Sequence, residues 1–406
     1  MNAPSPHGAA TRRRWLRRLT GGVAAVVLLV MAVYAWAWVS VDRSSIARAM
    51  WWTEADVGDQ FRFPARAIPA GDEAGPLPVG AEIAPAPRSG TGADRTFDGF
   101  LRETDTLAFL VVDDDELVYE RYLGGADPED RQTSFSVAKS FVSTLVGIAI
   151  DEGLIASVDD AVTSYVPELA ERDPRFGRIR LRHLLTMTSG IRYEEQSLPL
   201  PWGDDVNTYY GTDLRDLALS ATEIEGPPGG GWLYNNYNPL LLGLVLERAT
   251  GMSVSEYMAT RLWQPLGAEA DATWSLDSED SGFEKLESGL NATPVDYARF
   301  GLLFLHDGRW NGTRIVSKDW VREATTTDVS AAPADDYYIA DNYQYFWWID
   351  TARPGRFYAL GNFGQYIYVA PDAGTVIVRN GTDWGVDNDS WVGLFRDIAD
   401  RLRGPS

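Results

Sequence analysis

Ser136 and Lys139 are the residues whose types and spacing most directly suggest chemistry. They begin an apolar run with helical spacing that reaches about Asp151. Residues three apart share a helix face, so the hydroxyl and the amine would lie together at a helix N-terminus, where free N–H groups stabilise negative charge. A desolvated lysine can accept a serine proton and so activate the hydroxyl as a nucleophile. The structural alternative is a capping serine followed by a surface lysine.

Lysine is rare in this chain, which makes Lys139 more informative. The chain has 36 lysine and arginine residues, but its lysines are only Lys139, Lys285 and Lys318. Arginine stays protonated in proteins, whereas a buried lysine can lose its proton. A lysine kept beside a serine therefore favours a role in proton transfer.

Composition disfavours several other kinds of site. The 406 residues include no cysteine, which excludes disulfides, thiolate nucleophiles and cysteine-based metal sites. The histidines are His7, His183 and His306, and no G-x-S-x-G motif is present, so a serine triad on that motif and a multi-histidine metal site are both disfavoured. We predict no metal and no cofactor. His183 lies between apolar residues and is interpreted as a structural hydrogen-bonding residue.

The N-terminal segment differs from the remainder in charge. The net charge is −22, yet the first forty residues hold five arginines and no acidic residue. The acidic remainder disfavours nucleic-acid binding. Arginines within 12–18 precede the uncharged stretch Leu19–Val41, which is long enough to cross a bilayer and predicts a cytoplasmic N-terminus with the body outside the cytoplasmic membrane. We prefer an uncleaved single-pass anchor over export with cleavage near residues 35–37, because the run is long for a signal.

Composition and apolar periodicity divide the chain into segments. Residues 1–42 would form the arginine-rich tip and anchor, residues 43–95 a connector, and residues 96–403 the body, with 70–96 an exposed linker rich in Pro, Gly and Ala. Within the body, alternation predicts a hairpin of strands 107–112 and 117–122, and later strands 365–370 and 375–379 that follow an aromatic run at 343–348. Helical periodicity covers 134–151, 180–190, the segment after 238 through 248, 294–306 and 389–402.

Two further motifs accompany the serine and the lysine. Tyr234-Asn235-Asn236 follows a glycine-rich stretch and precedes an apolar helix. A tyrosine in aromatic surroundings is often a core residue, but the asparagine two positions later favours a functional role. The stretch 359–365 carries Gly361 between apolar and polar residues.

In this order and at this spacing, the three motifs resemble those of serine hydrolases of the β-lactamase and penicillin-binding-protein superfamily. The resemblance covers about 96–403 and is nearest to class C-like esterases, D,D-peptidases and 6-aminohexanoate-dimer hydrolases. The first motif is Ser136-Val137-Ala138-Lys139 and the second is Tyr234-Asn235-Asn236. The third usually reads Lys-Thr-Gly or His-x-Gly; here Ala359-Leu360-Gly361 keeps the glycine and lacks the cation.

The resemblance implies an α+β fold in which helices flank an antiparallel β-sheet and a mostly helical lobe completes the body, preceded by the transmembrane helix. The sheet would come from about 96–165 and 290–403. The site would lie between the sheet and the helical lobe, which the middle of the chain would supply.

The resemblance also implies roles for the motif residues. Ser136 would be acylated by an ester or amide, while Lys139 and Tyr234 share the proton transfer. A phenol with a pKa near 10 needs a nearby cation for this work at neutral pH. Asn236 would hydrogen-bond Lys139.

The substrate side of the site would be formed by the third motif. The backbone N–H groups of Ser136 and Asn362 would form the oxyanion hole, and Gly361 would let the substrate approach the strand. Gln365 is placed among the substrate-binding residues, although Gln365 and Asn291 could equally be loop hydrogen-bonders. Three aromatic residues of the loop-rich middle could line the cleft or cover the core: Trp202, Tyr209 and Tyr210.

Three functions stay open at this point. The preferred one is hydrolysis of a small ester or linear amide. A membrane-anchored sensor that binds such ligands without turnover is a second, and the complete first motif argues against it. A D,D-peptidase or β-lactamase is a third, and the missing cation of the third motif argues against it.

Overall fold

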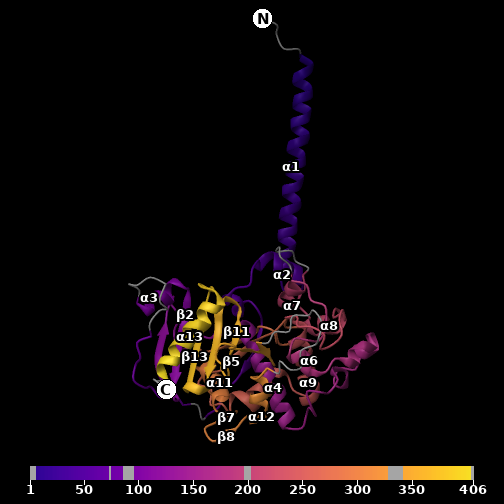
Figure 1. The fold of residues 1–406 in the computed structure, drawn as a ribbon. Coiled ribbons are helices and arrows are strands. Elements are labelled where there is room, and N and C mark those ends of the chain that lie inside the picture. The colour runs from indigo at the N-terminus through magenta and orange to yellow at the C-terminus, as the bar shows by residue number, and fades with distance from the viewer. Residues whose placement is uncertain (1–5, 73–74, 86–95, 196–202, 328–341, 404–406) are drawn as a thin grey trace. The chain divides into compact units, whose positions relative to one another are not determined.

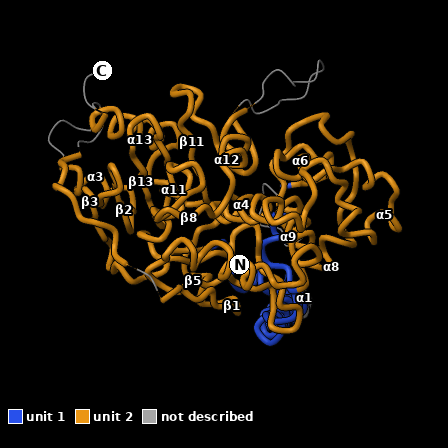
Figure 2. The backbone as a smooth tube through the Cα atoms, turned by 90° about the horizontal axis from the view of Figure 1, so that it is seen from below, with its two compact units in different colours: residues 1–55, 195–212 blue, residues 56–194, 213–406 orange. Residues whose placement is uncertain are grey.

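The computed structural model describes residues 6–72, 75–85, 96–195, 203–327 and 342–403. The chain forms two compact units, which Figure 2 colours separately. One contains residues 1–55 and 195–212, and the other contains residues 56–194 and 213–406.

The smaller unit begins with the long helix α1 (Pro6–Ser40; Figure 1). Its stretch Arg18–Ser40 is long and apolar enough to cross a membrane, and most of its side chains are exposed. A signal sequence would have the same length and composition. The stretch is therefore a membrane anchor or a signal.

Arg48 connects the other elements of this unit, α2 (Ser45–Trp52) and α7 (Asp204–Tyr210). Its side chain is buried, and it donates hydrogen bonds to the carbonyls of Val41 and Gly211, each at 3.0 Å. The guanidinium also lies 5.4 Å from the centre of the Trp52 ring. One buried cation thus joins three segments through main-chain acceptors, which need no second charge.

The larger unit is built on a seven-stranded antiparallel sheet with the order β3-β2-β13-β12-β11-β10-β9. The strands are β2 Thr106–Asp113, β3 Glu116–Tyr122, β9 Tyr343–Gln344, β10 Trp347–Ile349, β11 Phe357–Gly361, β12 Gln365–Ala370 and β13 Thr375–Gly381. The predicted hairpin and the two predicted C-terminal strands are confirmed. The aromatic run 343–348 itself supplies β9 and most of β10, because aromatic residues suit a sheet buried on both faces.

Alternation along the strands assigns the two faces of this sheet. In β12, Tyr366 and Tyr368 pack in one cluster with α3 (Phe97–Glu103) and α13 (Asn388–Leu402). Their neighbours Ile367 and Val369 point the other way, into the larger core that contains α11 (Pro294–Leu305). The predicted helices 294–306 and 389–402 are therefore confirmed as the layers that flank the sheet.

A helical region packs beside α11 in the larger core (Figure 1). Its centre is the contact between α4 (Ala138–Asp151) and α9 (Tyr237–Thr250). Leu240 to Leu246 of α9 are almost entirely buried. The remaining helices of this unit are α5 Glu168–Arg172, α6 Leu181–Leu185, α8 Leu214–Ser220, α10 Val254–Met258 and α12 Lys318–Ala324. The α+β fold with a sheet, flanking helices and a helical lobe is confirmed.

Short elements complete the unit. A four-stranded antiparallel sheet has the order β1-β5-β6-β4, and β7 pairs with β8. Their bounds are β1 Ala65–Ile68, β4 Gln132–Thr133, β5 Ala272–Ser275, β6 Leu290–Ala292, β7 Arg309–Trp310 and β8 Thr313–Arg314. The short 3₁₀ and π turns are η1 Val57–Phe61, η2 Phe135–Val137, η3 Val162–Ser164, η4 Pro174–Arg178, η5 Ala259–Trp263, η7 Asn362–Gly364 and η8 Pro371–Ala373.

The segment expected to be an exposed linker is partly bound to the body. Leu77 is buried, and the backbone N–H groups of Gly80 and Ile83 donate to the carbonyls of Leu117 and Val118 at 3.1 and 2.9 Å. An edge strand exposes unpaired backbone groups, and here this segment covers β3. Composition averaged over 70–96 hid the few apolar residues that attach it.

Candidate active site

Ser136 and Lys139 meet as their spacing predicted. Ser136 lies in η2, one short turn before α4, and Lys139 lies in the first turn of α4. Lys139 Nζ donates a hydrogen bond to Ser136 Oγ at 2.9 Å. The lysine is 1% exposed. A surface lysine beside a capping serine is thereby excluded.

The surroundings of Lys139 favour its neutral form. Burial lowers the pKa of Lys139 to about 7, although the carboxylate of Glu287 acts in the opposite direction. Nζ also donates to the main-chain carbonyl of Glu287 at 2.8 Å and lies 4.9 Å from the centre of the Tyr234 ring. A lysine with this pKa can accept a proton at neutral pH.

The second motif lies at the start of α9, against the same lysine. Tyr234 packs in an aromatic group with Trp232, Tyr343 and Trp348. Asn236 does not make the expected bond to Lys139 within the part of the chain that the structure describes: its Nδ2 donates to Tyr193 Oη at 2.9 Å. The reason is that the lysine uses a hydroxyl and a main-chain carbonyl instead.

The third motif brings β11 against the segment that leads into Ser136. A Cβ atom added to Gly361 would lie 2.2 Å from the carbonyl oxygen of Ser134, so only glycine allows this approach. Ala359 is fully buried and Leu360 is partly exposed. The close contact of the strand with this segment therefore requires a glycine at position 361.

Two strained residues flank the proposed oxyanion donors. Phe135, directly before Ser136, has φ 45°, and Phe363, directly after Asn362, has φ 59°. Their rings contact edge to face with centres 5.1 Å apart. Bulky residues rarely adopt positive φ, and such strain gathers at sites where the surrounding structure fixes the backbone.

Gln365 and Asn291 are structural in their contacts. Gln365 is buried; its Nε2 donates to the carbonyls of Gly381 at 2.7 Å and Asn362 at 3.1 Å, and its Oε1 accepts from Asn380. Gln365 thus supports the turn η7 from within, and we assign it a positioning role in place of direct substrate binding. Asn291 is fully buried in β6 and bonds Thr133 and the Gly289 carbonyl, both at 3.0 Å.

Other candidates lie elsewhere. His183 Nδ1 accepts from the backbone N–H of Arg180 at 3.1 Å, which confirms its structural role, and burial lowers its pKa to about 4. Tyr210 belongs to the smaller unit, where it packs on Tyr209 and Trp52. Trp202 lies outside the described residues.

Sequence reasoning missed the turn that holds Lys139. Lys285 Nζ pairs with Glu287 Oε1 at 2.7 Å, and the exposed fractions of the two side chains are 2% and 1%. Ser288 Oγ donates to the same carboxylate oxygen at 2.9 Å. The available signal was Lys285, the second of three lysines, but no motif connected it with Ser136.

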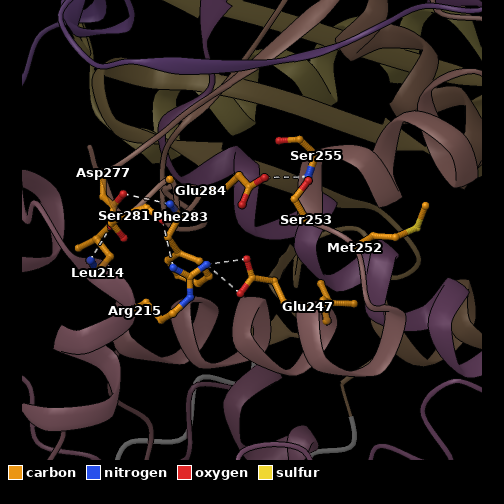
Figure 3. Close-up of polar contacts among 12 residues, drawn as sticks. Leu214, Arg215, Glu247, Met252, Ser253, Ser255, Asp277, Ser281, Phe283 and Glu284 are labelled. Carbon is orange, nitrogen blue, oxygen red and sulfur yellow. Dashed lines mark hydrogen bonds and ion pairs between the residues drawn. The ribbon is translucent and has the colours of Figure 1, made fainter. Parts of the chain in front are cut away.

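A buried polar cluster fixes the segment that leads to this turn (Figure 3). Asp277 accepts from the backbone N–H of Leu214 at 2.7 Å, and Glu284 accepts from that of Ser255 at 3.1 Å. Burial raises the pKa of Asp277 above its usual range, while the backbone N–H of Leu214 acts in the opposite direction. The segment is therefore attached to both α8 and α10 before it reaches Lys285.

Comparisons with known proteins identify the family of this chain. The family model described as Beta-lactamase matches residues 93–391, so the chain belongs to that family of β-lactamase-fold hydrolases.

Two curated relatives are an amide hydrolase and a penicillin-binding protein. The chain is 32% identical over 312 residues to the 6-aminohexanoate-dimer hydrolase of Paenarthrobacter ureafaciens, which covers 73% of this chain and 78% of that protein. It is 26% identical over 306 residues to penicillin-binding protein 4 of Amycolatopsis lactamdurans, with 67% and 77% covered.

A solved structure shows the same fold. The protein described as "Putative 6-aminohexanoate-dimer hydrolase from Bacillus anthracis" superposes with a TM-score of 0.76 at 24% identity, over 89% of this chain and 96% of that one. At this identity the likeness concerns the fold.

Proposed function

We propose that this protein is a serine hydrolase that cleaves a carboxylic ester or a linear amide through an acyl-enzyme on Ser136. The observation that carries the proposal is the 2.9 Å contact between Lys139 Nζ and Ser136 Oγ, in a site where burial brings the pKa of the lysine to about 7. The proposed nucleophile is thus in contact with a base that is about half neutral at pH 7.

The acylation step follows from these contacts. Neutral Lys139 accepts the hydroxyl proton as Ser136 Oγ forms a bond to the substrate carbonyl carbon. The backbone N–H groups of Ser136 and Asn362 stabilise the oxyanion, and one such donor contributes about 3 kcal/mol in other enzymes. Tyr234, whose ring faces the lysine, gives its phenolic proton to the leaving alcohol or amine as the carbon–oxygen or carbon–nitrogen bond breaks, and Lys139 passes the serine proton to the phenolate, so both side chains regain their starting states.

Water completes the cycle. Lys139 accepts one proton from the water as its oxygen bonds to the acyl carbon. The bond from the acyl carbon to Ser136 Oγ then breaks, which releases the acid, and the proton returns from Lys139 to Ser136 Oγ. Neutral substrates are favoured, because β11 presents Ala359 and Leu360 where carboxylate-binding relatives carry a cation and a hydroxyl. Hydrolysis of esters or amides by relatives such as the 6-aminohexanoate-dimer hydrolase supports this substrate class.

A substrate panel with one active-site variant tests the proposal. The full-length protein in detergent should hydrolyse a chromogenic butyrate ester or a short linear amide, and a fluorophosphonate probe should label it. Ser136→Ala should remove both activities while its circular dichroism spectrum stays unchanged. Turnover retained by this variant would end the proposed mechanism. Labelling of the wild type without turnover of any substrate would favour the sensor alternative.

We also propose that α1 is an uncleaved anchor that holds the body outside the cytoplasmic membrane. Ala37, at the end of the candidate cleavage motif, is fully buried, and α1 packs against α2 within the smaller unit. Protease added to spheroplasts should digest the body, which should fractionate with membranes beforehand. A protected body would contradict this topology, and soluble release would indicate cleavage.

A further inference from the structure

The turn that holds Lys139 contains a second buried lysine, and the mechanism above gives that lysine no role. Lys285 and Glu287 lie on one turn, where the backbone N–H groups of Ser288 and Gly289 both donate to the Lys285 carbonyl. The main-chain carbonyl of Glu287 accepts from Lys139 Nζ at 2.8 Å, and its carboxylate bonds Lys285 Nζ at 2.7 Å. One residue thus contacts both lysines.

We propose that Lys285 is a positioning residue that balances the charge of Glu287 and so keeps Lys139 able to act as a base. The proposal rests on the proposed function, because it concerns the proton acceptor of Ser136. The proposed role belongs to the ion pair between the Lys285 and Glu287 side chains, and the main-chain contact from Glu287 to Lys139 is a separate interaction.

Burial is what makes the balance important. The exposed fractions of the Lys285 and Glu287 side chains are 2% and 1%, so water screens neither charge. Glu287 Oε2 has no hydrogen-bond partner among the described residues, so Lys285 and Ser288, both on Oε1, supply the neutralising contacts in that part of the chain. Without Lys285, the full negative charge of the Glu287 carboxylate would act on Lys139, the nearest buried amine, and raise its pKa further.

The charged groups that influence Lys139 in the proposed way are Glu287 and Lys285. Among the described residues, Lys139 Nζ contacts the side chains of Ser136 from η2 and Tyr234 from the segment before α9, and the charge of the Glu287 carboxylate acts on it. Glu287 is the acidic one, and its charge raises the pKa of Lys139 against the effect of burial. Lys285 Nζ lies 4.7 Å from the centre of the Phe63 ring, and this cation–π contact helps hold the ammonium in place.

Two single variants should move the pH profile in opposite directions. Lys285→Met removes the balancing cation, so Lys139 should hold its proton more tightly and the acid limb of kcat/KM should shift upward by about one pH unit or more. Such a shift means about tenfold less activity below the new pKa, with recovery at alkaline pH. Glu287→Gln leaves Lys285 unbalanced, so the limb should shift downward. The double variant should restore the wild-type position.

The controls separate charge from structural damage. Lys318→Met removes an exposed lysine that pairs with Asp307 at 2.6 Å, and it should leave the limb in place. Lys285→Arg keeps the charge and should also leave it in place. Loss of kcat in both single variants without a shift of either limb would overturn the proposal.

Circular dichroism and thermal unfolding show whether each variant folds, and the proposal can still be tested if Lys285→Met does not. In that case Glu287→Gln decides: a downward shift supports the proposal and an unshifted limb overturns it. Failure of the proposed function itself would appear separately, as activity retained by Ser136→Ala. An unshifted limb in a protein that still depends on Ser136 rejects the role of Lys285 alone.

Discussion

The two walls of the candidate site use charge differently. On the wall formed by η2, α4 and the turn 285–288, Lys139 contacts the proposed nucleophile and Lys285 contacts Glu287 beside it. On the wall formed by β11 and η7, the nearby cation is Arg379, which is buried and donates to the main-chain carbonyls of Phe363 and Gly364 at 3.2 and 2.7 Å. Burial lowers the pKa of Arg379 to about 9. The cation of the first wall contacts the proposed nucleophile, whereas the cation of the second wall holds the turn η7.

This difference separates reactivity from substrate choice. The first wall has the groups that the proposed proton transfer needs, with Ser136 in contact with the buried Lys139. In the proposed mechanism the second wall offers backbone donors and apolar side chains to the substrate, and Arg379 bonds main-chain carbonyls of the fold instead. If the proposed function holds, a fold of this family can combine this proton chemistry with a substrate wall that does not select for an anionic ligand.

The largest expected effect comes from breaking the first wall at Lys139. Lys139→Arg keeps a positive charge but removes a group that can give up its proton. We expect kcat/KM on a neutral ester to fall by about 100-fold or more, the usual scale for a lost proton-transfer residue. Steady-state rates beside Lys318→Arg, an exposed control, give the comparison. Near-normal activity would mean that Lys139 supplies charge alone.

We expect a smaller change in kcat/KM when substrates of different charge are compared at the second wall. A butyrate ester and a matched ester whose acyl chain ends in a carboxylate differ in one charge. Without charge-assisted hydrogen bonds, each typically about 1.5–3 kcal/mol, we expect kcat/KM to favour the neutral ester by roughly 10- to 100-fold. The same reasoning places chromogenic cephalosporins, which are anionic, behind the neutral ester.

A variant of the second wall sharpens this test. Leu360 is partly exposed, so Leu360→Lys can place an ammonium beside the substrate, whereas Ala359 is fully buried and offers no such room. The variant should narrow the gap between the two esters, and Leu360→Met should leave it unchanged. Equal rates of the wild type on both esters would contradict this description of the wall.

The smallest effect is the pH dependence of the wild type. Burial lowers the pKa of Lys139 to about 7, and the lysine acts as a base only when neutral. Activity should therefore rise with pH, at about half of its plateau near pH 7 and about a tenth near pH 6. Rates on a neutral ester between pH 5 and 9 measure this. A profile without an inflection between pH 6 and 8 would exclude Lys139 as the titrating base.

Local rules predicted much of the fold and the first motif. Alternation identified the hairpin and the strands 365–370 and 375–379, because their side chains separate onto two buried faces. Spacing placed Ser136 beside Lys139, since residues three apart in a helical turn meet without help from the remainder of the chain. Scarcity of lysine favours a role in proton transfer for this contact, which stays a prediction.

What the sequence determined by itself is therefore the set of local contacts: the strands, the helices and the pairing of Ser136 with Lys139. Only the tertiary structure decided which distant groups surround that pair. Asn236 was expected at Lys139 and bonds Tyr193 instead, while the carbonyl of Glu287, 148 positions from Lys139, takes its place. The physical reason is that a buried amine is satisfied by whichever acceptor the packing of distant segments brings within reach, and no spacing along the chain encodes that choice.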